Sequence, residues 1–137
     1  MKISPNNTCP CGSLLKYKKC CKVFHDGILP KTALELMKSR YCAFSIEKSE
    51  YIIDTTHKNN PDFTSDLKSW NMDILNFSKN TQFKNLEIID FIDDKIESFV
   101  TFKATLIQNQ NDISFTEKSR FLKVEGKWFY VDGEFLE

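Results

Sequence analysis

The residues with the clearest chemistry in this sequence are four cysteines close together near its beginning. Four thiolates form the tetrahedral ligand set that Zn²⁺ prefers, and iron is the alternative ion. Pro10 stiffens the turn between the first two cysteines, and Gly12 permits the unusual backbone angles that follow it. We predict one structural metal ion, zinc first, bound by Cys9, Cys11, Cys20 and Cys21.

Two disulfides are the competing interpretation of the same cysteines. Adjacent Cys20 and Cys21 argue against them, because a bridge between neighbours is strained and Cys42 is the only other cysteine. Nearby positive charge favours a metal, since it offsets the negative charge that four thiolates leave around a divalent ion. That charge comes from Lys16, Lys18, Lys19 and Lys22. Four protein ligands leave no open position for a water nucleophile, so we expect a structural site.

The cysteine segment resembles the SEC-C zinc motif, which is named after the C-terminal tail of the preprotein translocase ATPase SecA. The agreement lies in residues 7–13 (NTCPCGS) and 16–21 (KYKKCC), where both the ligand spacing and the intervening residues match. The family usually has a second glycine where this chain has Leu14, and a Lys or similar residue at Leu15. These two leucines either form a contact surface or pack on the following domain.

The remaining residues predict helices first and strands afterwards. Thr32 and Glu35 form a capping box at the start of a helix, and residues 48–56 and 66–79 follow with helical periodicity. Alternating patterns separated by short turns then predict four strands, at 84–92, 96–108, 112–124 and 127–131. We therefore expect an α+β fold in which helices pack on one face of a curved antiparallel sheet. The predicted domains are a metal-binding knuckle at 1–27 and an α+β domain at 28–137.

Most of this second part resembles the YchJ-like (UPF0225) family. The similar segments are residues 33–44 (ALELMKSRYCAF), 117–121 (EKSRF) and 126–133 (GKWFYVDG). The family joins an SEC-C motif to an NTF2-like, cystatin-related cone, so the resemblance implies that fold for residues 28–137. It implies no activity, because the family has no established biochemical function.

One strand face mixes apolar and polar residues in a way that suggests a pocket. Glu117 and Ser119 alternate with aromatic residues in the predicted third strand, and a buried carboxylate needs a partner. We expect Arg40 on the first long helix to be that partner. One alternative is a ligand-binding or catalytic pocket lined by Arg40, His57 and Glu117. Its rim would be completed by Tyr41, Trp70, Tyr130 and Asp132.

The other alternative is an Arg40–Glu117 ion pair that ties the helix to the sheet, with His57 as a surface residue. We favour this structural interpretation. The sequence has no nucleophile motif and no Gly-rich phosphate loop, so catalysis has no specific signal and the chain is more readily interpreted as a non-enzyme.

Composition limits the classes of partner. Lys+Arg and Asp+Glu both total 19, so no global field attracts nucleic acid or anionic lipid, and no specific nucleic-acid signal is present. No apolar run is long enough for a membrane span or a secretory signal, so we expect a cytoplasmic protein.

The leading functional prediction is a non-enzymatic metal-binding adaptor. Its lysine-rich knuckle would dock on an acidic protein or a ribosome-associated partner. A pocket function in the larger domain is the rival prediction. A scaffold that forms a homodimer through its sheet is the third.

Overall fold

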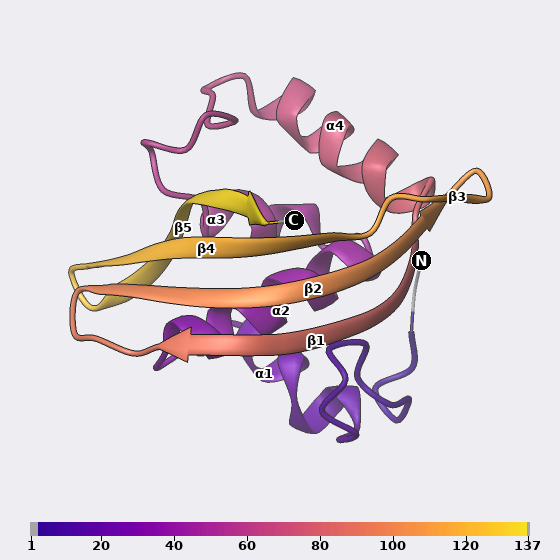
Figure 1. The fold of residues 1–137 in the computed structure, drawn as a ribbon, viewed down its shortest axis with the longest axis horizontal. Helices are drawn as coiled ribbons and strands as arrows, with labels where there is room; N and C mark the ends of the chain where they lie inside the picture. Colours follow the sequence, from indigo (N-terminus) through magenta and orange to yellow (C-terminus); the bar gives the residue numbers. More distant parts are fainter. Residues whose placement is uncertain (1–2, 137) are drawn as a thin grey trace.

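Helices come first and strands follow, in the order that the sequence predicts (Figure 1). The computed structural model describes residues 3–136. A turn of 3₁₀ helix, η1 (Tyr17–Lys19), and a short helix, α1 (Cys21–His25), belong to the cysteine-rich segment. The elements after them are α2 (Ala33–Ser45), α3 (Ser49–Asp54), α4 (Leu67–Lys79), β1 (Gln82–Ile92), β2 (Glu97–Gln108), β3 (Asn111–Asp112), β4 (Phe115–Val124) and β5 (Lys127–Leu136).

The strands form one antiparallel sheet in the order β1-β2-β4-β5, and the short β3 pairs with β2. Short turns join the neighbouring strands. Between β4 and β5 the turn residues Glu125 and Gly126 have φ values of 50° and 82°, as a type I′ hairpin turn requires. The predicted α+β class, with helices packed on an antiparallel sheet, is therefore confirmed.

Two predicted strand boundaries were wrong. The third strand is interrupted near Ser114, whose Oγ accepts a hydrogen bond from the Leu106 backbone N–H at 3.0 Å and so turns the chain between β3 and β4. The last strand does not end at residue 131 but continues to Leu136, because residues 132–136 pair with β4. Neither the hydrogen bond to Ser114 nor the pairing of residues 132–136 with β4 can be predicted from sequence periodicity.

The capping residues define the helix starts. Thr32 Oγ1 accepts a hydrogen bond from the Glu35 backbone N–H at 3.1 Å, as the capping box predicts. The reciprocal bond is shifted by one residue, because Glu35 Oε1 accepts from the Lys31 backbone N–H at 2.7 Å. Asp66 caps α4 in the same manner by accepting from the Ser69 N–H.

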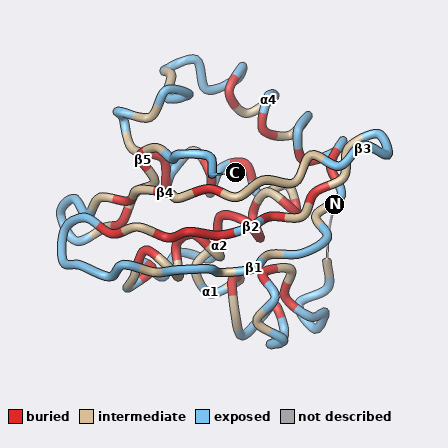
Figure 2. Tube along the Cα trace, viewed as in Figure 1, coloured by how far each residue is buried: buried red, intermediate tan, exposed pale blue. Residues whose placement is uncertain are grey.

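The main core lies between α2 and the inner face of the sheet. Figure 2 shows buried positions gathered on β2, on β4 and on the helix behind them. Alternate residues of β2 point inward, which follows from the two-residue period of a strand. The largest contributions come from Leu36, Met37, Tyr41, Val100, Phe102, Leu106, Phe121 and Trp128.

Helix α2 is buried on more than one side. Met37 and Tyr41 face the main core, whereas Leu34 and Phe44 are only half-buried. Cys42 is fully buried on another side, in a second cluster formed with the cysteine-rich segment. Ala43 is fully buried in a third cluster with residues of α3 and α4, so the helix packs against three groups of residues.

The two longest helices of residues 3–136, α2 and α4, have 13 residues each. A membrane-spanning helix needs about 20 apolar residues. None of the helices described in this chain is long and apolar enough to cross a membrane.

Candidate functional site: a cysteine cluster and an internal cavity

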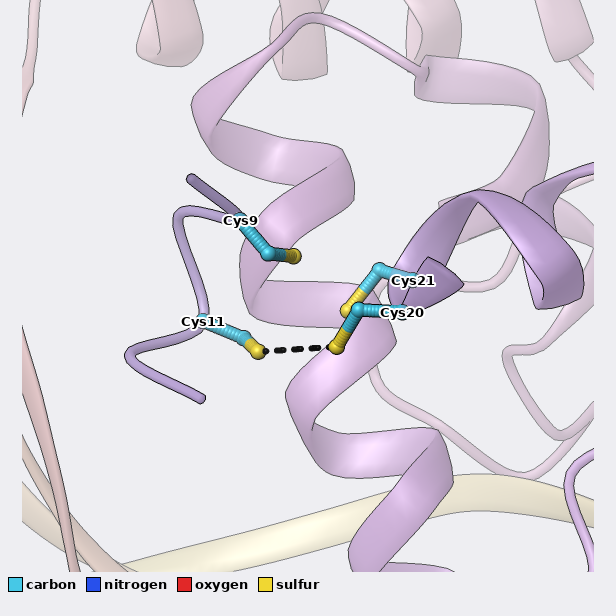
Figure 3. Close-up of side chains that lie close together, drawn as sticks. All are labelled: Cys9, Cys11, Cys20 and Cys21. Carbon is cyan, nitrogen blue, oxygen red and sulfur yellow. Dashed lines mark hydrogen bonds between the residues drawn. The ribbon is translucent and has the colours of Figure 1, made fainter. Parts of the chain in front are cut away.

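The four N-terminal cysteines converge on one point (Figure 3). We call residues 3–27, which carry them, the knuckle. All four Sγ atoms lie within 4.8 Å of one another, and those of Cys11 and Cys20 are 3.5 Å apart. Cys9, Cys11 and Cys21 are buried, whereas Cys20 is partly exposed. The cluster thus brings together the residues that the sequence predicts as metal ligands.

A small hairpin positions the first pair of cysteines. Thr8 and Lys16 form an antiparallel bridge, and the Cys9 backbone N–H donates to the Leu15 carbonyl at 2.8 Å. The chain reverses at Gly12, whose φ of 86° suits glycine because it lacks a Cβ. The second pair of cysteines lies where η1 gives way to α1, so the two sulfur pairs face each other.

The donor set and its spacing fit a tetrahedral metal ion. A Zn–S bond length of about 2.3 Å places the sulfurs of a regular tetrahedron about 3.8 Å apart. The observed separations bracket that distance, so only small shifts of the side chains would be needed. Without a bound cation, the four thiols cannot all become thiolates at once. Hydrogen bonds from Cys11 and then Cys21 lower the pKa of Cys9, while the bond to Cys11 raises the pKa of Cys21. A cation would remove this conflict.

Two further side chains border the cluster. Ser13 Oγ lies 3.2 Å from Cys20 Sγ, and Cys42 Sγ lies 3.9 Å from Cys9 Sγ. Cys42 comes from α2 and is fully buried. Cys42 packs directly against Cys9, one of the candidate ligands. The far side of the metal site is therefore a wall made by the larger domain.

His25 links the knuckle to α2, with one hydrogen bond to α2 and one within the knuckle. Its Nε2 donates to the Ser39 carbonyl at 2.8 Å, and its Nδ1 accepts from the Tyr17 hydroxyl at 2.6 Å. The ring also packs edge-on against Tyr51 of α3. Burial lowers the pKa of His25, which favours the neutral ring that this bonding pattern requires.

The larger domain contains a cavity of about 640 Å³ between the inner face of the sheet and the helices α2, α3 and α4. Its walls are mainly apolar and aromatic. They include Tyr41, Phe44, Trp70, Ile74, Phe83, Phe102, Leu106, Phe115 and Phe121. This volume lies within the range of about 300–1,000 Å³ that small-molecule sites occupy.

Arg40 borders this cavity and is nearly fully buried. Its Nη1 donates to the Ile52 carbonyl at 3.1 Å, to Thr55 Oγ1 at 2.8 Å and to Thr56 Oγ1 at 3.1 Å. The guanidinium also stacks on the ring of Tyr130, 4.7 Å from its centre. Burial lowers the pKa of Arg40 to about 10, so the group remains positively charged at neutral pH.

Glu117 lies in the same cavity on β4. Its Oε2 accepts hydrogen bonds from Tyr130 Oη at 2.9 Å and from Ser119 Oγ. Burial raises the pKa of Tyr130, so its hydroxyl keeps the proton that it donates. Gly133, which pairs with Ser119 across the strands, leaves room for the carboxylate, since a Cβ there would overlap it.

The predicted direct pair of Arg40 and Glu117 was wrong. The ion pairs between side chains of residues 3–136 are Lys22–Asp26, Arg120–Glu97 and Arg120–Asp132. Tyr130 lies between the two cavity charges, with its ring under Arg40 and its hydroxyl on Glu117. Arg40 and Glu117 both line the cavity, but they do not pair across it.

Two other predicted pocket residues lie elsewhere. His57 does not line the cavity, because the hydrogen bond from its backbone N–H to the Tyr130 carbonyl places it beyond the end of α3. Asp132 instead forms two hydrogen bonds with Arg120, on the opposite face of the sheet. Tyr41, Trp70 and Tyr130 do line the cavity, as expected.

Sequence reasoning missed the acidic mouth of the cavity. Asp62, Asp66 and Asp73 are exposed lining residues from the segment before α4 and from α4 itself. Asp66 had a visible signal as a helix cap, but its position beside a cavity depends on how α4 packs. Nothing in the local pattern of Asp62 distinguishes it from an ordinary loop residue.

Two family profiles match the chain. The SEC-C motif covers residues 6–22, and the profile described as "YchJ, middle NTF2-like domain" covers residues 32–133. The chain belongs to the YchJ (UPF0225) family. A UPF0225 protein of Streptomyces coelicolor is 36% identical over 97% of this chain and 99% of its own length. The UPF0225 protein YchJ of Shigella dysenteriae is 31% identical over 91% of this chain and 81% of its own length.

Solved structures of similar proteins carry the same fold. A SEC-C motif containing protein from Psychrobacter arcticus matches with a TM-score of 0.79 and 29% identity, over 93% of this chain and 82% of that one. Another, from Rhodopseudomonas palustris, matches with a TM-score of 0.82 and 24% identity, over 96% of this chain and all of that one. The SEC-C motif and the converging cysteines together indicate a metal site in this YchJ-family chain.

The outer side of the knuckle exposes apolar and basic residues together. Leu14 is 86% exposed and has a φ of 69°, in the left-handed region that favours glycine. Leu15 is 53% exposed, so neither leucine packs on the larger domain. Lys16, Lys18 and Lys19 are exposed beside them, whereas Lys22 is half-buried and pairs with Asp26.

The metal site makes a first prediction, in which Cys42 serves as the control. Replacing Cys20 by Ala removes one ligand, and replacing Cys42 by Ala removes a neighbouring sulfur from outside the ligand set. We expect C20A to weaken Co²⁺ binding beyond the roughly 10- to 100-fold effect of an outer-shell change, and C42A to stay within it. The intensity of the thiolate-to-Co²⁺ absorption bands measures both. Equal losses in the two variants would contradict this ligand set.

The contact between Gly133 and Glu117 makes a second prediction. We expect G133A to destabilise the protein by about 1–3 kcal/mol, because the new Cβ displaces the Glu117 carboxylate from its two hydrogen-bond donors. In an E117A background the same substitution should be nearly neutral. Urea unfolding of the four proteins in this double-mutant cycle gives the coupling free energy. A coupling near zero would mean that Glu117 does not occupy this space.

Proposed function

We propose that this protein is a non-enzymatic ligand-binding protein, whose NTF2-like domain holds a small apolar molecule and whose knuckle binds one structural zinc ion. The cavity beneath the sheet carries the proposal. It combines about 640 Å³ of space, aromatic walls and two buried charged groups that do not neutralise each other by direct contact. Such an arrangement is typical of a binding site, because a few polar groups orient a ligand held mostly by apolar contacts.

Zinc is the ion that best suits the knuckle. Four thiolates in a tetrahedral arrangement form a common structural zinc site, and zinc needs no further ligand there. Burial of three of the cysteines against α2 supports a role in holding the knuckle to the larger domain. A segment of this length cannot bury enough apolar surface to fold alone, so metal binding contributes much of its folding free energy.

A binding function is favoured over catalysis by the arrangement of the cavity charges. His57 lies away from the cavity, so a carboxylate–histidine pair for proton transfer does not form. One oxygen of Glu117 is already held by Tyr130 and Ser119. These groups fix the position of a ligand.

Filling the cavity tests the proposal. Ala104 is buried on the inner face of β2, and Thr105 next to it points to the opposite face. We expect A104F to weaken binding of the neutral apolar dye Nile red by about ten-fold or more, because the added ring occupies the cavity. The matched control T105F should bind the dye like the unmodified protein. Equal dye fluorescence for A104F and the unmodified protein would reject the cavity as a binding site.

The exposed surface of the knuckle favours a second function, that of an adaptor. Leu14 combines high exposure with a strained backbone, and three exposed lysines lie close to it in sequence. An apolar pair bordered by positive charge suits an acidic protein or a ribosome-associated partner.

The adaptor function predicts that binding and stability respond in opposite directions to one substitution. We expect L14G to stabilise the chain by about 1 kcal/mol, because glycine accepts the positive φ without strain. The same variant should bind purified ribosomes less well in co-sedimentation. Alanine at Lys16, Lys18 and Lys19 should also weaken binding, and more so at low salt. If neither change affects co-sedimentation, the ribosome is not the partner.

A further inference from the structure

We propose that the cavity binds a small aromatic or aliphatic carboxylic acid, and that the guanidinium of Arg40 holds its carboxylate at the inner end. This inference rests on the ligand-binding function proposed above and adds the chemical class of the ligand. The observations that carry it are the unused donors of Arg40, the missing counter-ion and the apolar walls.

The guanidinium of Arg40 has hydrogen bonds on one nitrogen only. Within residues 3–136, Nη1 makes all three of its bonds, and Nε and Nη2 make none. Among residues 3–136, Ser78 Oγ is the only fully buried side-chain N or O atom without a partner. Nε and Nη2 of Arg40 therefore each keep some contact with solvent. Arg40 as a residue is 8% exposed and lines the cavity. Two donors of a buried cation are therefore accessible to a ligand.

These two nitrogens form one side of the guanidinium. Nε–H and one N–H of Nη2 point in parallel, which is the fork that grips both oxygens of a carboxylate. The remaining side, at Nη1, is fixed by the Ile52 carbonyl and the two threonines at the end of α3. The side-on face of Arg40 is thus oriented in advance for a planar two-oxygen anion.

Among residues 3–136, Arg40 has no direct counter-ion. Its three acceptors are uncharged, and Glu117 is separated from it by the Tyr130 side chain. A buried cation without a partner anion is unfavourable, because the interior solvates it poorly. An anionic group of a ligand would supply the missing partner.

Glu117 restricts the charge of that ligand. A second negative group close to the ligand head disfavours a dianion such as a phosphate monoester, which would meet only one cation here. A single carboxylate adds one negative charge and matches the one positive charge of Arg40. The free Oε1 of Glu117 can accept a hydrogen bond from a hydroxyl or N–H group of the ligand.

The walls define the rest of the ligand. Phe83, Phe102, Phe115 and Trp70 are among the cavity walls, so the ligand body is apolar. Asp62, Asp66 and Asp73 are exposed at the mouth, where water and salt screen their repulsion of an incoming anion. The buried guanidinium therefore determines which head group is preferred.

Three matched probes test the inference: naphthylacetate, naphthylethanol and naphthylethylamine, which share a ring and differ in the charge of the head group. We expect calorimetry on the full-length zinc-loaded protein to show the acid binding about ten-fold more tightly than the alcohol, with the amine weakest. Arg40→Gln should remove the preference for the acid while Nile red still binds. Arg40→Lys, which retains the charge and loses the fork, should retain only part of it.

Glu117→Gln provides an independent readout if the Arg40 variants do not fold. Removing this negative charge should tighten binding of the acid several-fold, because its repulsion of the carboxylate disappears. Equal affinities for the three probes, or tightest binding of the amine together with its loss in E117Q, would overturn the inference and leave the ligand-binding function standing. Binding of neither the probes nor Nile red would overturn both.

Discussion

The structure depends on the packing of a single helix, α2, which contacts the sheet, the knuckle and the helices α3 and α4. On one side Met37 and Tyr41 enter the core beneath the sheet, and on another Cys42 lies against the sulfur of Cys9. Ser39, between these positions, receives the hydrogen bond from His25 of the knuckle through its carbonyl. Because α2 contacts both parts, the cysteine-rich segment and the NTF2-like domain support each other through this helix.

The same helix carries the cation of the cavity. Arg40 lines the cavity, and Cys42, two residues later, packs on the knuckle. The two contacts therefore lie within about one turn of α2. A further chain of contacts runs from His25 through Tyr51 to the hydroxyl of Ser39. The cysteine-rich segment therefore contacts the helix that positions Arg40, both directly and through Tyr51.

The two charged groups of the cavity are kept apart. A direct pair of Arg40 and Glu117 would draw α2 toward β4 and satisfy both groups. Instead the Tyr130 ring stacks on the cation while its hydroxyl donates to the carboxylate. Gly133 contributes by leaving space for Glu117 beside the neighbouring strand. An aromatic spacer and a missing Cβ thus keep two charged groups apart within an apolar interior.

The sequence by itself determined the features that depend on neighbouring residues. Cysteine spacing identified the sulfurs that converge, the Thr32 cap located the start of α2, and alternation identified the antiparallel strands. Only the tertiary structure decided how distant side chains meet. It placed Tyr130 between Arg40 and Glu117 and turned His57 away from the cavity. Local periodicity shows which face a side chain occupies, but the partner across that face depends on how helices and sheet pack in three dimensions.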